Sequence, residues 1–145
     1  MFAHILLPTD GSKLSEGAVF RGIELARQCG ARVTGLYVAP EFHILSYQVD
    51  VIEDTEATWA VDRKAHADRY LAFIAHTAAE AKVACETLME VSDHPYQRIC
   101  SLAEQRGCDL IGMASHGRKG MAGLLLGSET QRVLTHSKTP VIVWR

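Results

Sequence analysis

The feature of this sequence that most constrains its fold is the alternation of short apolar runs with longer amphipathic segments. The short runs are rich in apolar and β-branched residues, and several stop at a proline or a turn sequence, as strands do. The longer segments repeat their apolar side chains with the helical period of about 3.6 residues. Strands that alternate with helices predict a parallel sheet with helices on both faces, so the expected fold class is α/β.

The same pattern gives the bounds of nine expected elements. The predicted strands span residues 4–7, 31–38, 85–91, 109–115 and 140–145. The predicted helices span residues 13–29, 56–82, 94–107 and 128–137. Residues 41–55 lack a clean period and are expected to form a loop, either closing over a ligand or lying in a subunit interface.

Polar and glycine residues mark where two of these helices should begin or end. Asp10 or Ser12 can cap the first helix, and Gly30 follows it as a C-terminal glycine would. Ser128 and Gln131 fit a capping box at the start of the last helix.

Composition limits the class of protein. The 145 residues suit one domain, 1–145, and 48% of them are hydrophobic, enough to bury a core. A formal net charge of -2 shows no basic footprint of nucleic-acid binding. No apolar run approaches the roughly 20 residues of a membrane-spanning helix, and the start, "MFAHILLPTDGS", lacks the basic region of a signal peptide. We therefore expect no nucleic-acid or membrane partner.

Cysteine and histidine usage indicates a reducing compartment and no structural metal. None of the four cysteines, Cys29, Cys85, Cys100 and Cys108, belongs to a C-x-x-C pair, so reduced thiols are expected. The seven histidines lack zinc-site spacing. These features predict a cytoplasmic protein.

Two predicted strand ends carry unusual chemistry. In an open parallel sheet, ligands bind outside the carboxyl ends of the strands, where the strand order reverses. The first strand runs into "PTDGS", residues 8–12, and the fourth into "ASHG", residues 114–117. If these two strands are neighbours, both segments face one crevice.

The stretch "MASHGRKGMAGLLLGSET", residues 113–130, has the ingredients of an anion site. Its glycines let backbone N–H groups approach a ligand, and "GSET" opens a helix whose free N–H groups favour negative charge. The standard motifs G-x-x-x-x-G-K-[ST] and G-x-G-x-x-G are absent. Two interpretations stay open from these residues alone: a phosphate-binding loop, or a flexible turn before a helix that Ser128 caps.

Four segments of the chain resemble the universal stress protein family: "HILLPTDGS", "GARVTGLYV", "CDLIGMASHGRKGMAGLLLGSETQRVL" and "KTPVIVWR". Their order and spacing match over essentially the whole chain, most weakly across residues 41–56. The ATP-binding branch of this family has Gly, two residues, Gly, nine residues, Gly, then Ser or Thr. The corresponding positions are Ala114, Gly117, Gly127 and Ser128, with the nine-residue spacing intact.

Ala114 stands where that motif has its first glycine. If the backbone there needs a positive φ, alanine costs on the order of 1 kcal/mol. If a ribose or phosphate approaches closely, the added methyl group obstructs it. Weakened or unchanged nucleotide binding is the expectation, and another branch of the family lacks the motif and binds no ATP.

The resemblance implies a fold and the residues that hold the nucleoside. The fold is an open five-stranded parallel sheet, Rossmann-like and similar to the adenine-nucleotide α-hydrolases, with strand order 3-2-1-4-5. Asp10 accepts hydrogen bonds from the ribose or the adenine, Val38 offers backbone groups to the adenine edge, and Pro8 and Met113 line the base. Each has a simpler local role: Asp10 as a helix cap, and the others as core or strand-end residues.

The resemblance also implies a set of residues around the phosphates. Gly117, Gly127, Ser128, Glu129 and Thr130 surround them through backbone N–H groups and hydroxyls, with the side chain of Glu129 in solvent. The same predicted site includes Thr9, Ala114, His116 and Arg118. His116 either touches phosphate or packs under the loop. The side chains of Arg118 and Lys119 either reach the β and γ phosphates or form a solvated tip of the loop. Mg²⁺ or Mn²⁺ is recruited by the phosphates rather than by protein ligands.

The implied function is an ATP-binding stress-response protein whose nucleotide state tunes its interactions with unidentified protein partners. No general base beside a nucleophile is evident, so no catalytic residue is assigned, and hydrolysis is weak at most. Two alternatives are a nucleotide-free dimeric interaction module of the same fold and a slow ATPase. The last strand, Val141 to Arg145, would be an apolar sheet edge. The resemblance implies a homodimer through this strand, with Trp144 as an anchor.

Overall fold

The computed structural model describes residues 1–43, 56–118 and 125–145 and has a five-stranded parallel sheet at its centre. The elements are β1 His4–Thr9, α1 Lys13–Cys29, β2 Arg32–Ala39, α2 Glu56–Glu80, β3 Cys85–Val91, α3 Pro95–Gln105, β4 Leu110–Ala114, α4 Ser128–His136 and β5 Val141–Trp144. The strand order β3-β2-β1-β4-β5 confirms the predicted α/β class and topology.

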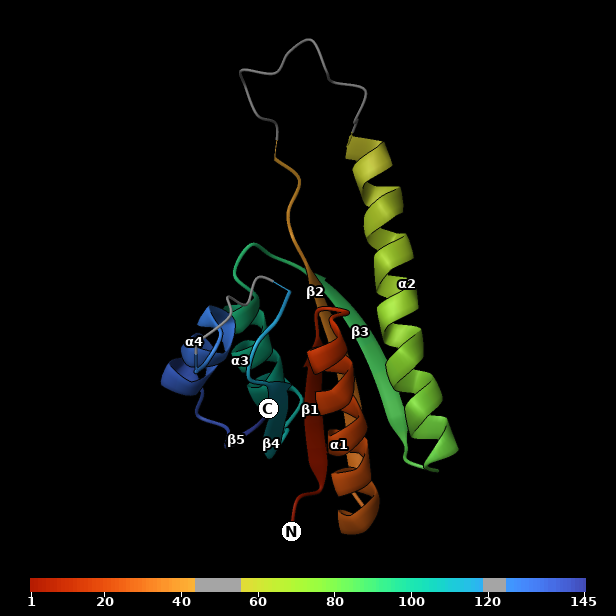
Figure 1. Cartoon of the computed structure of the whole chain (residues 1–145), viewed down its shortest axis with the longest axis vertical. Helices are drawn as coiled ribbons and strands as arrows, with labels where there is room; N and C mark the ends of the chain where they lie inside the picture. The colour runs from red at the N-terminus through yellow and green to blue at the C-terminus, as the bar shows by residue number, and fades with distance from the viewer. Residues whose placement is uncertain (44–55, 119–124) are drawn as a thin grey trace.

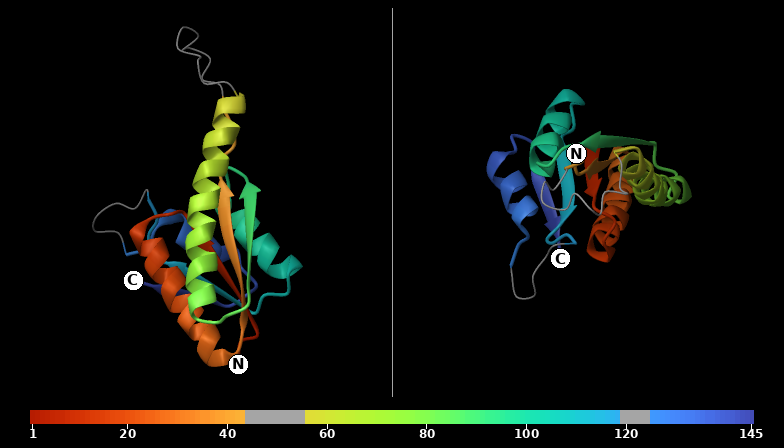
Figure 2. Two further views of the ribbon diagram at one scale, coloured as in Figure 1. Left: turned by 90° about the vertical axis from the view of Figure 1, so that its right-hand side faces the viewer. Right: turned by 90° about the horizontal axis from the view of Figure 1, so that it is seen from above.

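Helices cover both faces of the sheet, as Figures 1 and 2 show: α1 and α2 lie on one face, and α3 and α4 on the other. The alternation of side chains along a strand divides the core into two layers. On β1, Ile5 and Leu7 pack with α1 and α2, while Leu6 packs with α3 and α4. Each face of the sheet therefore buries its own apolar layer, and the expected α/β sandwich follows.

The predicted bounds agree with the structure to within two residues. The end of β1 is one of the bounds that differ. We expected that strand to stop before Pro8, but Pro8 lies inside it and is paired in register with Leu36 of β2. Pairing with β4 involves only Ile5 and Leu6. The backbone of His4 faces β4, and by alternation so does that of Pro8, which has no N–H to donate; the β1–β4 ladder accordingly ends at Leu6.

Both ends of α1 form as the sequence predicts. Ser12, one of the two expected caps, is the N-cap, and its Oγ accepts a hydrogen bond from the N–H of Ser15 at 3.2 Å. Gly30 ends the helix with a φ of 68°, a left-handed conformation that glycine adopts without steric cost.

The start of α4 corrects the predicted capping box. The N-cap is Gly127 rather than Ser128, and no side chain caps the helix. Gln131 donates through Nε2 to the carbonyl of Leu126 at 3.1 Å. The N–H of Gly127 donates to the carbonyl of Ser115 at 2.6 Å, which ties residue 127 to the end of β4 and sets the helix start.

Helix α2 extends beyond the carboxyl ends of the strands, as Figure 1 shows. Within the described residues no helix combines the length and the apolar character that crossing a membrane requires. All four cysteines are free thiols, as expected, and Cys108 is the buried one. Of the predicted loop, residues 44–55 lie outside the described part of the chain.

Candidate functional site

The carboxyl ends of β1 and β4 adjoin, as the strand order implied by the family resemblance requires, and Asp10 connects them. One carboxylate oxygen, Oδ2, accepts a hydrogen bond from the N–H of Arg118 at 2.6 Å. The other, Oδ1, accepts from the N–H of Ser12 at 2.9 Å. Asp10 therefore does not cap α1 itself but fixes the turn before that helix against the loop after β4.

Both motif glycines are explained by close packing within the chain. A Cβ at Gly117 would overlap the Oδ2 of Asp10, and a Cβ at Gly127 would come within 3.3 Å of the carbonyl oxygen of Ser115 and the Cα of His116. Neither glycine has a positive φ. Their missing side chains therefore allow the loop after β4 to contact both Asp10 and the start of α4.

The first turn of α4 presents backbone N–H groups beside this loop. The N–H groups of Ser128, Glu129 and Thr130 have no acceptor among the described residues, as expected for a helix start without a side-chain cap. The hydroxyl of Thr130 is buried and donates to the carbonyl of Ala114 at 2.9 Å. The hydroxyl of Ser128 is exposed and has no partner in the described part of the chain.

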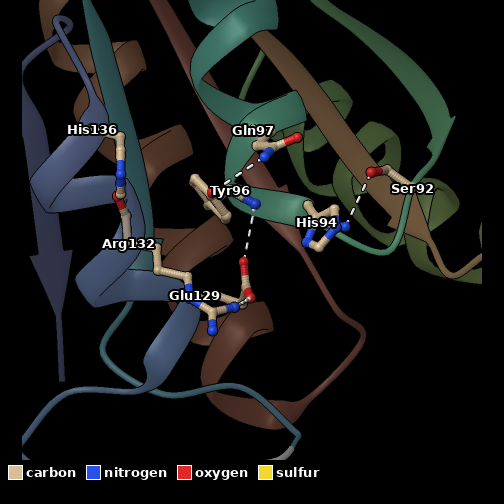
Figure 3. A network of polar contacts seen from close by, with 7 residues as sticks. All are labelled: Ser92, His94, Tyr96, Gln97, Glu129, Arg132 and His136. Carbon is tan, nitrogen blue, oxygen red and sulfur yellow. Dashed lines mark hydrogen bonds and ion pairs between the residues drawn. The ribbon is translucent and has the colours of Figure 1, made fainter.

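The carboxylate of Glu129 corrects another expectation, because it does not point into solvent. Figure 3 shows that its Oε2 accepts a hydrogen bond from the N–H of Tyr96 at 3.0 Å, and Arg132 bonds its Oε1 at 2.9 Å. The N-cap of α3, His94, makes no side-chain cap hydrogen bond, and Pro95 follows it. Glu129 therefore supplies the acceptor that the start of α3 lacks.

Ala114 causes no backbone strain. Among the described residues the positive φ angles belong to Gly11, Gly30, Gly107 and Lys82, so Ala114 needs no conformation that glycine favours. It is 8% exposed and lies in β4, in register with Trp144 of β5. The conformational cost considered for the missing motif glycine does not arise.

The three residues predicted to surround the base lie at the strand ends, but their side chains differ in exposure. Met113 is buried and packs with Leu6 and Leu36, and Val38 packs against the same cluster. Pro8 is half-buried. Val38 lies one residue beyond the last β1–β2 pair, so its backbone, rather than its side chain, is what this arrangement offers to a ligand.

Two polar side chains of the predicted site bond their own neighbours. The Oγ1 of Thr9 accepts hydrogen bonds from the hydroxyl of Ser15 at 2.8 Å and from the N–H of Gly11 at 3.1 Å, which fixes the β1–α1 turn. The Nδ1 of His116 lies 3.0 Å from the Oγ of Ser115. The Nε2 of His116 is buried without a partner in the described residues.

Arg118 bonds a residue that the sequence did not assign to the site. Its Nη2 donates to the hydroxyl of Tyr70 on α2 at 2.9 Å, and its Nε donates to the carbonyl of Asp10 at 3.2 Å. Tyr70 appeared in the sequence only as one apolar position of the α2 stripe. No sequence signal connected it with Arg118. Lys119 lies outside the described residues.

One group of three side chains in the described residues has metal-ligand geometry. Candidate ligand atoms of Glu41, His43 and Asp93 all lie within 4.8 Å of one another at the exposed surface. The side chains of His43 and Asp93 bond each other, and this bond lowers the pKa of the Asp93 carboxyl. Sequence spacing missed the group because Asp93 is far along the chain from the other two. These residues lie outside the predicted nucleotide site.

The fold and this loop define a class of protein: a Rossmann-like α/β chain whose β4 continues through a glycine-containing loop into an uncapped helix. The sequence model of the universal stress protein family matches residues 1–145, and the chain belongs to that family.

Individual relatives agree with this assignment. The chain is 29% identical to the universal stress protein YxiE of Bacillus subtilis, over 100% of both chains. The solved structure of MJ0577, a universal stress protein of Methanocaldococcus jannaschii, superposes with a TM-score of 0.82 and 27% identity, covering 99% of this chain and 95% of that one. A universal stress protein in complex with cAMP superposes with a TM-score of 0.73 and 26% identity, covering 99% and 97%.

Proposed function

We propose that this chain binds an adenine nucleotide at the carboxyl ends of β1 and β4. The observation that carries this proposal is the start of α4, where the N–H groups of Ser128, Glu129 and Thr130 have no acceptor among the described residues. Three converging N–H donors and the positive end of the helix dipole favour a phosphate group. The exposed hydroxyl of Ser128 adds a fourth donor.

The surroundings of this helix start fit an anion. The Glu129 carboxylate, which would repel a phosphate, accepts hydrogen bonds from Tyr96 and Arg132 instead. The buried hydroxyl of Thr130 bonds Ala114, so Thr130 would contribute its backbone N–H and not its side chain. The proposed phosphate contacts therefore come from Gly117, Ser128, Glu129 and Thr130, chiefly through the backbone.

An adenine nucleotide is the ligand class that the family relationship favours. The related universal stress protein that is 26% identical to this chain was solved in complex with cAMP. The motif positions Gly117, Gly127 and Ser128 favour ATP within this class, with Mg²⁺ or Mn²⁺ held chiefly by its phosphates. Asp10 and the backbone of Val38 would hold the nucleoside.

The biological role that we propose is regulation by nucleotide state in a cytoplasmic homodimer. Four free thiols are typical of a reducing compartment. Strand β5 has β4 as its neighbour on one side, and its four residues are only half-buried. An unpaired, largely apolar edge favours pairing with β5 of a second copy.

Released and added nucleotide test the proposal separately. Freshly purified protein is denatured and the supernatant is analysed by mass spectrometry for adenine nucleotides. The protein is then stripped of nucleotide and titrated calorimetrically with ATP and Mg²⁺. The proposal predicts released nucleotide or a saturable heat of binding. The absence of both would contradict it and would favour a nucleotide-free interaction module.

A further inference from the structure

Tyr70, which lies outside every motif of this chain, contacts the predicted phosphate-binding loop through Arg118. The hydroxyl of Tyr70 accepts a hydrogen bond from the Nη2 of Arg118 at 2.9 Å. The Cζ of the same guanidinium lies 5.5 Å from the centroid of the Tyr70 ring, within cation–π range. Tyr70 of α2 therefore holds the Arg118 guanidinium both by a hydrogen bond and by a cation–π contact.

The Tyr70 ring is a fixed partner. It is 9% exposed and packs edge-on against the ring of Tyr37 with centroids 5.2 Å apart. The ring of His66 stacks on it at 5.9 Å. The ring also lies so close to Gly11 that a Cβ at that position would overlap it. Because these contacts hold the ring, a change in the Arg118 contact requires the arginine to move.

The side chain of Arg118 is held by hydrogen bonds to Tyr70 and to the carbonyl of Asp10, and its backbone is fixed as well. Its N–H is bonded to the carboxylate of Asp10, while the residue as a whole is exposed. The preceding residue, Gly117, has its nitrogen 3.7 Å from the position of a Cβ on Gly127, the N-cap of α4. The backbone that carries the guanidinium is therefore fixed one residue after Gly117, which lies beside the N-cap of α4.

We propose that Tyr70 competes with the distal phosphates of a bound nucleotide for the Arg118 guanidinium, and so sets the preference between adenosine mono- and triphosphate. This inference rests on the proposed nucleotide function. A single phosphate is satisfied by the N–H groups of Ser128, Glu129 and Thr130 without Arg118. The two further phosphates of ATP attract the guanidinium, which must leave Tyr70 to pair with them.

The competition predicts opposite effects for the two partners. Loss of the Tyr70 hydroxyl removes one hydrogen bond that ATP must break, an interaction equivalent to roughly two- to tenfold in affinity. Tyr70→Phe should therefore tighten ATP binding by that factor and leave AMP binding unchanged. Arg118→Gln should weaken ATP binding and leave AMP binding unchanged. In the double variant the Tyr70→Phe gain should disappear, because its cause is the release of Arg118.

Dissociation constants for ATP and AMP, measured by calorimetry at one salt concentration, test the inference. Tyr37→Phe is the matched control, because it removes a neighbouring phenol for which no hydrogen bond to Arg118 exists. We expect it to keep the ATP-to-AMP affinity ratio of the unaltered protein. The ratio is the decisive quantity, because a merely structural role of Tyr70 would change both constants together.

Three outcomes would overturn the inference. They are an ATP-to-AMP affinity ratio that is the same in Tyr70→Phe and the unaltered protein, a gain in ATP affinity that persists in the double variant, and equal weakening of ATP and AMP binding by Tyr70→Phe. In each case nucleotide binding stands and only the competition fails. If the unaltered protein binds neither ATP nor AMP, the proposed function fails and the inference fails with it.

Discussion

Glu129 and Tyr96 join the first turns of α4 and α3, two helices that begin 33 residues apart in the sequence. The Oε2 of Glu129 accepts a hydrogen bond from the N–H of Tyr96 at 3.0 Å, and Arg132 holds the other oxygen (Figure 3). A carboxylate at a helix N-terminus is stabilised by free N–H groups and by the helix dipole. The helix start proposed to bind phosphate is thus fixed against α3 by a bond within the chain.

Removal of this carboxylate should destabilise the protein. Glu129→Ala leaves the start of α3 without its acceptor and should lower the free energy of unfolding by about 1 kcal/mol. Glu129→Gln keeps an acceptor and should cost less. Ser128→Ala is the control, because the exposed Ser128 hydroxyl has no partner among the described residues. Urea unfolding measures all three, and equal stability of Glu129→Ala and Ser128→Ala would contradict the capping role.

Alanine should have opposite effects at two glycines. At Gly117 the new Cβ overlaps the Asp10 carboxylate, which must shift. The hydrogen bond that the N–H of Arg118 donates to this carboxylate is then lost, which should lower the free energy of unfolding by about 1–3 kcal/mol. At Gly17 in α1 nothing lies within 4 Å of the new Cβ. There alanine should stabilise by roughly 0.5–1 kcal/mol, because a helix interior favours alanine over glycine. Thermal and urea unfolding test both signs, and a stabilising Gly117→Ala would refute the packing account of the motif.

His4 should make the stability of the protein sensitive to acid. Its Nε2 bonds the Oγ1 of Thr34 at 2.7 Å, and that hydroxyl donates to Glu86 at 3.0 Å. Its Nδ1 is buried without a partner among the described residues. Burial, assisted by the charge of Arg32, lowers the pKa of His4 below its ordinary value of 6.5.

The direction of the effect follows from this pKa. As pH falls below 6.5 the unfolded chain binds a proton on His4 that the folded chain excludes, so the free energy of unfolding decreases. Above that pH the contribution is fully present. His4→Gln removes the titrating group, and its unfolding free energy should fall less with acidification than that of the unaltered protein. Parallel pH profiles for the two proteins would contradict this role of His4.

The proposed dimer can be tested at one residue of β5. The carbonyls of Pro140 and Trp144 accept hydrogen bonds from the N–H groups of β4 and of Ser115, the residue after it. Alternation along the strand therefore directs the N–H of Val143 away from β4. Val143→Pro should therefore break antiparallel pairing between two copies while β4–β5 pairing remains. We expect sedimentation to show a dimer for the unaltered protein and for Val143→Ala, and a monomer for Val143→Pro. A monomeric unaltered protein at micromolar concentration would contradict the proposal.

Much of the fold could be predicted from the sequence, because hydrophobic period and turn residues are local. Strand bounds, helix bounds and the Gly30 helix end depend on residues that are close in sequence. The capping box failed for a tertiary reason. Ser128 and Gln131 satisfy the local pattern, but the hydrogen bond between Gly127 and Ser115 places the N-cap at Gly127, so Ser128 is the first residue of the helix and not its cap.

The candidate site was predictable only in part, for the same reason. The segments around Asp10 and Gly117 follow adjacent strands, so topology brings them together. The bond between Arg118 and Tyr70 joins residues 48 positions apart on different elements, and no period or spacing encodes it. The side chain of Glu129 was expected in solvent. Its role as acceptor for the N–H of Tyr96 depends on where α3 begins in space, which the local sequence does not show.

The central claim, that an adenine nucleotide binds with a phosphate at the start of α4, is tested most directly by amide resonances. Nitrogen-15-labelled protein, stripped of nucleotide, is titrated with AMP and then with ATP and Mg²⁺ while its amide spectrum is recorded. The account predicts saturable shifts that are largest for Ser128, Glu129 and Thr130, whose N–H groups lack acceptors among the described residues. Saturable shifts that leave these three amides unmoved, or no shifts at millimolar nucleotide, would contradict it.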